Sequence, residues 1–228
     1  MLIVSMSHHS RDWNICEHCN LYLDLDAQAC PNCEQPILRD AAGKIALWRL
    51  GTLPDGIIGN LAAGLREALG VGVVIQPTFL DERPSARPKW KGLSSGVFLD
   101  QVHRRHRSGV FVNLGVTASN IVPDSEHNFL FGYAYLDEPA AVISLHPLDP
   151  TGVAPQLLVK RLLNIAIHEI GHTLGLDHHG YDDGVECVMI GDEAIDSLEG
   201  VDQCTSAFCS ACQEATRETH RQRSANYP

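Results

Sequence analysis

One stretch decides the fold expected of this 228-residue chain: His168-Glu169-Ile170-Gly171-His172-Thr173-Leu174-Gly175-Leu176-Asp177-His178. Two histidines four positions apart lie on the same side of a helix and can bind one zinc ion. Glu169 is adjacent to the first histidine, so its carboxylate can act on a water without being a ligand. Gly175 adopts a positive φ at little cost, and the turn there can bring His178 to the same metal.

Three protein ligands leave one position of a tetrahedral zinc site open, which is the arrangement of catalytic rather than structural zinc. The sequence therefore predicts hydrolysis of a peptide bond through a zinc-activated water, with Glu169 as the general base. The full pattern H-E-x-x-H-x-x-G-x-x-H, followed by a methionine turn, resembles the metzincin signature. Met189 lies where that turn is expected, although a single methionine is more often core packing.

The periodicity outward from this stretch predicts an α/β fold. Apolar residues recur at helical spacing at Leu158, Leu162 and Ile165, within a helix that runs from Pro155 to the glycine at 175. Strands are expected at 44–50, 71–75, 110–116, 129–135 and 140–145, and further helices at 56–69 and 97–107. We expect a loop-rich, metal-binding tail after the last helix.

Composition restricts the class of protein. The chain has 17 basic and 28 acidic side chains, and its net charge of −11 disfavours nucleic acid as a partner. No apolar run is long enough to span a membrane, and the first residues do not form a signal peptide. We therefore expect a cytoplasmic protein whose thiols are reduced. We also expect a monomer without a membrane partner.

The eight cysteines form two groups of four. The first group is a pair of Cys-x-x-Cys turns separated by ten residues, Cys16, Cys19, Cys30 and Cys33. This spacing is typical of a closed zinc site, with iron or two disulfides as weaker alternatives. We predict a zinc-ribbon-like module and linker over residues 1–43, used for docking or stability, and a catalytic domain over residues 44–228.

The second group carries a resemblance to a known family. Cys187-Val188-Met189 and Cys209-Ser210-Ala211-Cys212 follow the histidine motif, and the segments 128–134 and 141–145 precede it. In these motifs the chain resembles the archaemetzincins, a metzincin-like family of zinc metalloproteases, over about residues 45–220. The resemblance implies a compact catalytic domain with a mixed sheet and an active-site helix. It also implies that an extended peptide lies along the strand at 129–135.

The resemblance further implies a structural zinc bound by four ligands. The family has a cysteine directly after the third histidine, and this chain has His179 there, with a longer spacer before Cys187. Carried over by position, the ligands are His179, Cys187, Cys209 and Cys212, and Cys204 is the alternative fourth ligand. With the catalytic site and the N-terminal module, the chain would bind three zinc ions.

A second function remains open from the sequence. The chain could be a catalytically silent, zinc-stabilised module that binds peptides or proteins without cutting them. The presence of Glu169 favours the peptidase, because a binding module needs no general base. In either case the expected partner is a peptide or protein.

Overall fold

A computed structural model of the chain describes most of its residues. These are Asn14–Ile15, Tyr22–Leu23, Asn32, 44–54, 56–78, 93–105, 110–122, 130–149, 152–180, 184–191 and 197–226. The chain separates into two compact units, Met1–Arg39 and Asp40–Pro228. In the first unit β1 (Asn14–Ile15) pairs antiparallel with β2 (Tyr22–Leu23). The four cysteines of the predicted N-terminal zinc site lie outside the described residues, so that site stays a prediction.

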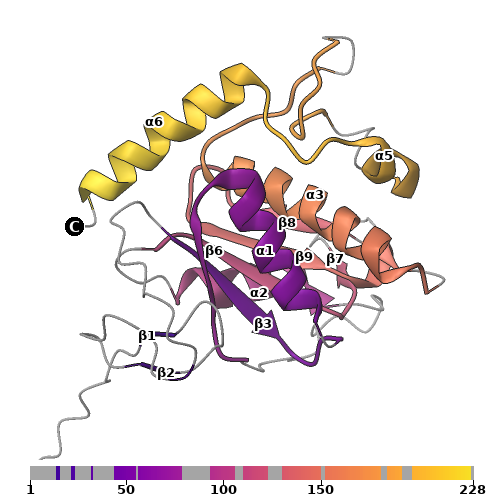
Figure 1. Cartoon of the computed structure of the whole chain (residues 1–228). Coiled ribbons are helices and arrows are strands. Elements are labelled where there is room, and N and C mark those ends of the chain that lie inside the picture. Colours follow the sequence, from indigo (N-terminus) through magenta and orange to yellow (C-terminus); the bar gives the residue numbers. More distant parts are fainter. Residues whose placement is uncertain are drawn as a thin grey trace, which may run out of the picture. The chain divides into compact units, whose positions relative to one another are not determined.

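The second unit is built on a five-stranded mixed sheet in the order β4-β3-β6-β9-β8 (Figure 1). Its strands are β3 (Lys44–Leu50), β4 (Gly72–Ile75), β6 (Val110–Thr117), β8 (Gly132–Ala134) and β9 (Ala140–Ser144). Four strands run parallel, and β8 pairs antiparallel with β9 at the edge. A short parallel pair, β5 (Leu93–Ser94) and β7 (Ile121–Val122), lies apart from this sheet. The predicted mixed α/β architecture is confirmed.

Helices cover both faces of the sheet, because its parallel strands are apolar on both sides. On one face, α1 (Ile57–Leu69) and α3 (Pro155–Thr173) pack with β3, β6 and β9 in the larger apolar cluster. On the other, α2 (Ser95–His103) packs against Ala46, Trp48 and Leu50 of β3. Figure 1 shows α3 lying across the sheet in front of β8 and β9. The active-site helix is therefore held between the sheet and the C-terminal segment.

The expected elements are found with small changes in their bounds. Helix α1 ends at Leu69 because Gly70 takes a left-handed conformation with φ of 65°. Helix α2 ends at His103, earlier than the predicted 107, and the strand expected at 129–135 is regular only over Gly132–Ala134. Phe129 lies outside the described residues, and Leu130 instead forms an isolated bridge with Ile121.

The expectation of a loop-rich tail was wrong for its last part. After η1 (His146–Leu148) and α3, the chain forms α5 (Leu198–Gln203) and then a long helix, α6 (Ser210–Asn226). Helix α6 is polar nearly all round, so it has no apolar stripe for a periodicity argument to detect. Its Ala, Glu, Arg and Gln residues are good helix formers, and that propensity was the available signal.

Within the described part of the chain, we find no helix with both the length and the apolar character needed to cross a bilayer.

Candidate active site

The three histidines of the motif converge on one point. The Nε2 atoms of His168 and His172 lie 3.0 Å apart, and those of His168 and His178 lie 3.1 Å apart. Two imidazole nitrogens bound to one tetrahedral zinc at 2.0–2.1 Å would be separated by about 3.3 Å. The spacing therefore suits three ligands of one metal ion.

Backbone carbonyls select the tautomer of two of these rings. His168 Nδ1 donates to the carbonyl of Val188, and His172 Nδ1 donates to that of Leu176, each at 2.9 Å. The Nε2 atom of each neutral ring is then an acceptor, so the close nitrogens cannot hydrogen-bond to one another. Burial, with the neighbouring His172 and His178, lowers the pKa of His168 to about 3 and keeps that ring neutral. A cation between the rings satisfies the acceptors of His168 and His172 and lies within reach of His178 Nε2, so the residues present fit a zinc ion.

The turn after α3 explains how His178 reaches the other two histidines. Gly175 has φ of 83°, and its N–H donates to the carbonyl of His172. The N–H of Leu176 donates to the carbonyl of Gly171, which completes a Schellman motif. The chain therefore reverses within one turn, and the same turn places the Leu176 carbonyl against His172.

Glu169 lies next to the first ligand and is buried, with 7% of its surface exposed. Burial raises the pKa of Glu169 to about 8, whereas a dication nearby would favour the charged form. The edge strand β8 passes directly over this carboxylate. A Cβ on Gly132 would lie 2.6 Å from Cγ and 2.8 Å from Cδ of Glu169, so only glycine leaves room for the base in this position.

A second group of ligands lies close to the first. The ligand atoms of His179, Cys187, Cys209 and Cys212 all lie within 4.8 Å of one another. The sulfurs of Cys187 and Cys212 are 3.8 Å apart, far longer than a disulfide bond of about 2.05 Å and close to the ~3.8 Å expected for two thiolates on one zinc. His179 Nε2 lies 3.1 Å from Cys212 Sγ and 3.4 Å from Cys209 Sγ.

Backbone groups of the cluster stabilise thiolates. Cys187 Sγ accepts hydrogen bonds from the N–H groups of Met189 and Cys209, at 3.5 and 3.3 Å. A hydrogen bond from the backbone of Cys212 lowers the pKa of the Cys209 thiol, while burial raises the pKa of Cys212. Buried sulfurs gathered with one imidazole suit a closed, structural zinc site.

The two groups share two short segments. His178 belongs to the first group and His179 to the second, and the 179 segment is bonded to the methionine turn through His179 N–H to the Met189 carbonyl at 2.7 Å. In that turn Cys187 contributes to the second group, while the carbonyl of Val188 holds His168. Met189 is fully buried beneath Gly171. The ligands of the two groups are therefore held by the same two segments.

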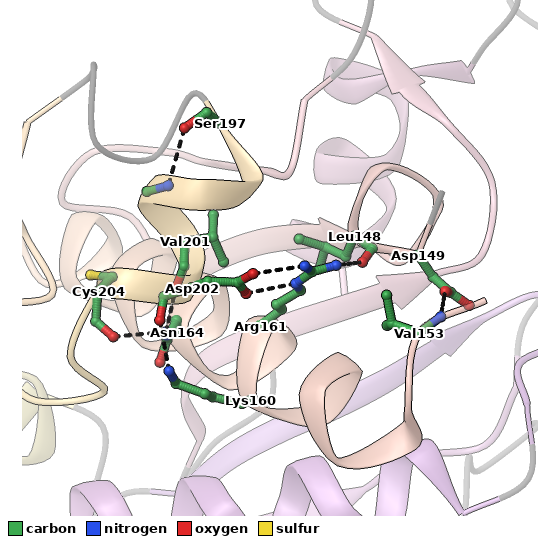
Figure 2. A network of polar contacts seen from close by, with 11 residues as sticks. Leu148, Asp149, Val153, Lys160, Arg161, Asn164, Ser197, Val201, Asp202 and Cys204 are labelled. Atoms are coloured by element: carbon green, nitrogen blue, oxygen red, sulfur yellow. Dashed lines mark hydrogen bonds and ion pairs between the residues drawn. The ribbon is translucent and has the colours of Figure 1, made fainter. Parts of the chain in front are cut away.

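Cys204, the alternative fourth ligand, contributes its backbone carbonyl to a hydrogen bond and, within the described part of the chain, does not join the converging ligands. Among the described residues its sulfur is not part of either group of converging ligand atoms. Its carbonyl accepts a hydrogen bond from Asn164 Nδ2 at 3.1 Å, and the Val201 carbonyl accepts one from the same amide at 2.9 Å (Figure 2). Asn164 is 1% exposed, so this amide attaches the segment before Cys209 to the middle of α3.

An ion pair strengthens the same attachment. Arg161, 6% exposed, donates through Nε and Nη2 to the two carboxylate oxygens of Asp202, each at 2.7 Å (Figure 2). Its Nη1 donates to the carbonyl of Leu148, also at 2.7 Å. Together with Asn164 this arginine fixes α5 on α3, and α5 leads directly to the cysteines of the second group.

Sequence reasoning missed the residues that support the ligands. The carbonyls of Val188 and Leu176 have no sequence signal, because every residue carries one. Gly132 gives a weak signal as a glycine next to a predicted strand. Arg161 and Asn164 give a stronger signal, since they are polar residues that adjoin the predicted apolar stripe of the helix, and polar groups at such positions are normally paired when buried.

Comparison with known proteins identifies the family. The model of peptidase family M54 matches residues 107–218. The archaemetzincin of Thermococcus kodakarensis is 30% identical over 181 residues, which cover 74% of this chain and 92% of that protein. The archaemetzincin of Archaeoglobus fulgidus is 37% identical over 106 residues, which cover 46% of this chain and 60% of that protein.

Solved structures agree with this match. The crystal structure of the archaemetzincin of Methanopyrus kandleri superposes with a TM-score of 0.66 at 26% identity, covering 80% of this chain and 98% of that one. That of Archaeoglobus fulgidus gives a TM-score of 0.63 at 28% identity, covering 75% and 99%. The chain belongs to the archaemetzincin family of metallopeptidases.

Proposed function

We propose that the chain is a zinc-dependent peptidase in which His168, His172 and His178 bind the catalytic zinc and Glu169 is the general base. One observation carries this proposal: three imidazoles present their Nε2 atoms to one point, and a buried carboxylate is adjacent to the first of them. Zinc, when bound there, polarises a carbonyl and makes water a usable nucleophile near neutral pH. The substrates are peptides or proteins.

The chain's own residues bind the substrate and transfer the proton. As the edge strand, β8 offers its backbone to an extended peptide, which places a peptide bond beside the histidines. Glu169 accepts the proton of the attacking water and then donates it to the leaving amine. The covering by β8 and Gly132 keeps bulk water away from this carboxylate, which strengthens its basicity relative to an exposed glutamate.

We assign a second, structural zinc to His179, Cys187, Cys209 and Cys212. The four ligand atoms converge, three of them are cysteines, and backbone N–H groups already satisfy Cys187. This zinc would join the segment after the third histidine, the methionine turn and the start of α6. A third zinc, bound by Cys16, Cys19, Cys30 and Cys33, rests on the sequence spacing alone, as does the division into a module of residues 1–43 and a domain of 44–228.

The test compares zinc-loaded wild type with Glu169→Gln on a library of quenched fluorescent peptides. Wild type should cleave, a chelator should abolish cleavage, and Glu169→Gln should be about 10²–10⁴-fold slower while keeping its zinc. Glu186→Gln, which changes an exposed acid on a neighbouring segment, is the matched control and should behave like wild type. Binding of library peptides with no cleavage by wild type would overturn the proposal in favour of a silent binding module.

A further inference from the structure

A cavity of about 430 Å³ lies between α6 and the body of the domain. None of the metal ligands of either group lines it, although Phe208 and Gln213 of its lining adjoin Cys209 and Cys212. Its floor is apolar and comes from the end of α1, the start of β6, α3 and the segment before Cys209. The floor residues are Leu69, Val71, Phe111, Ile170, Leu174 and Phe208. A volume of this size is within the usual range of small-molecule sites.

The cavity lies behind the active-site helix. Ile170 is two residues after His168, which is about 200° around a helix, so its side chain leaves the opposite side of α3. Ile170 and Leu174 are 0% and 6% exposed, and they form floor rather than rim. A molecule bound there would not compete with a substrate at the histidines.

The roof of the cavity is polar and cationic, in contrast to its apolar floor. Helix α6 contributes Gln213, Thr216, Arg217 and Arg221, which follow one another at three- and four-residue spacing on one side of the helix. A helix packed on an apolar surface normally places an apolar stripe there. Here the side of α6 that lines the cavity is polar and cationic. Leu69 and Val71 of the floor stay partly exposed, whereas the other four floor residues are buried.

The position of α6 is fixed by contacts at two points. Cys212 belongs to the cysteine group at its first turn, and Gln213 Nε2 donates to the carbonyl of Phe208 at 2.8 Å. Further along, the hydroxyl of Thr219 donates to the carbonyl of Leu174 at 3.1 Å. These contacts fix the position of α6 over the floor.

We propose that this cavity binds a medium-chain fatty carboxylate, with its chain on the apolar floor and its carboxylate at Arg217 and Arg221. Guanidinium groups bind carboxylates through paired, charge-assisted hydrogen bonds, and both arginines are exposed at the solvent side of the cavity. A simple inorganic anion would contact the arginines but leave Leu69 and Val71 partly exposed, whereas an aliphatic chain would cover them. The volume excludes a two-chain lipid.

The charge of the chain strengthens this argument. With a net charge of −11, the protein repels anions in general, and an anion would bind only where cations are gathered locally. Arg217 and Arg221 are one helical turn apart, and Arg221 already has a carboxylate partner in Glu218 at 3.0 Å. A carboxylate bound at the rim therefore has to share Arg221 with Glu218.

Calorimetric titration of the zinc-loaded full chain with decanoate tests the proposal. Excess acetate is included throughout, because it occupies carboxylate positions on a metal without filling an apolar cavity. We expect saturable binding of one equivalent, and binding of decanol about tenfold weaker because it lacks the charge. The variant Arg217→Ala/Arg221→Ala should weaken decanoate about tenfold and leave decanol unchanged.

A second variant tests the cavity itself. Thr216→Trp places an indole in the space beneath α6 and should abolish binding of both decanoate and decanol, while zinc content stays at the wild-type value. Arg104→Ala, which removes an exposed arginine directly after α2, is the control and should bind like wild type. No saturable binding by wild type, or equal affinity in wild type and both cavity variants, would overturn the proposal.

Discussion

Gly171 and Met189 share one space: a Cβ on Gly171 would overlap Sδ of Met189 and lie 3.1 Å from its Cε. The same Cβ would lie 3.1 Å from Cε1 of Phe208. Met189 is fully buried and follows Val188, whose carbonyl holds His168. The glycine inside the histidine motif and the methionine after it are therefore one packing unit, which fixes the height of α3 above the methionine turn.

Replacing Gly171 with alanine should destabilise the protein by about 1–3 kcal/mol, because the core around Met189 has no room for a methyl group. Helix propensity alone predicts that alanine raises the free energy of unfolding by up to about 1 kcal/mol. The packing argument and the propensity argument therefore predict changes of opposite sign. Thermal unfolding of zinc-loaded protein measures the change. Gly59→Ala is the control, since Gly59 is exposed in α1 with nothing within 4 Å of a Cβ. Equal stabilisation by both changes would show that the packing unit does not exist.

Replacing Gly132 with alanine should reduce kcat by about tenfold or more, because the new methyl group displaces the Glu169 carboxylate. Steady-state kinetics with a peptide substrate, together with zinc content, would measure this. Zinc content should stay at the wild-type value, since the nearest atoms to the new methyl belong to Glu169. In the double variant with Glu169→Gln, Gly132→Ala should cause no further loss. An additive loss would mean that Gly132 acts on the substrate and not on the base.

The sequence predicted the elements whose pattern is local. Leu158, Leu162 and Ile165 are all buried in α3, and Gly70 ends α1 as its position suggested. The ligand spacing at His168 and His172 also needed only helix geometry. Each of these features depends only on residues that are close together in the chain. The local sequence pattern is therefore enough to predict them.

Long-range relationships could not be predicted in the same way. Val188 holds His168 from twenty positions away, and Arg161 pairs with Asp202 from forty-one positions away. The first uses a backbone carbonyl, which has no sequence signal, and the second has many possible acidic partners in the tail. Helix α6 was missed for a different reason, since a polar helix that spans a cavity has no apolar stripe.

The assignment of His179 rather than Cys204 predicts a difference in zinc content. His179→Ala should lose one equivalent of zinc per chain, because three remaining cysteines leave the closed site incomplete. Cys204→Ser should keep all of its zinc, since the Cys204 sulfur lies outside the converging group. His179→Cys should also keep all of it, because a thiolate can replace the imidazole as ligand. Emission spectrometry of dialysed protein measures these values, and full zinc in His179→Ala with a loss in Cys204→Ser would reverse the assignment.

The pairing of Arg161 with Asp202 predicts a pH dependence of stability. The hydrogen bonds from Arg161 hold the pKa of Asp202 below its usual range. A carboxylate with a depressed folded-state pKa stabilises the protein above its unfolded pKa of about 3.9, and this contribution is lost as the pH falls. Asp202→Asn should therefore cost about 1–3 kcal/mol at pH 7, in part because the buried Arg161 loses its partner.

Urea unfolding of wild type and Asp202→Asn at a series of pH values measures this difference. The difference in unfolding free energy should be constant above about pH 5 and shrink below about pH 4. Loss of zinc in acid affects both proteins alike, since Asp202 belongs to neither group of metal ligands. Glu199→Gln, an exposed acid on α5, should show no such difference at any pH. If the Asp202→Asn difference were as large at pH 3 as at pH 7, the ionised pair would not be what fixes α5 on α3.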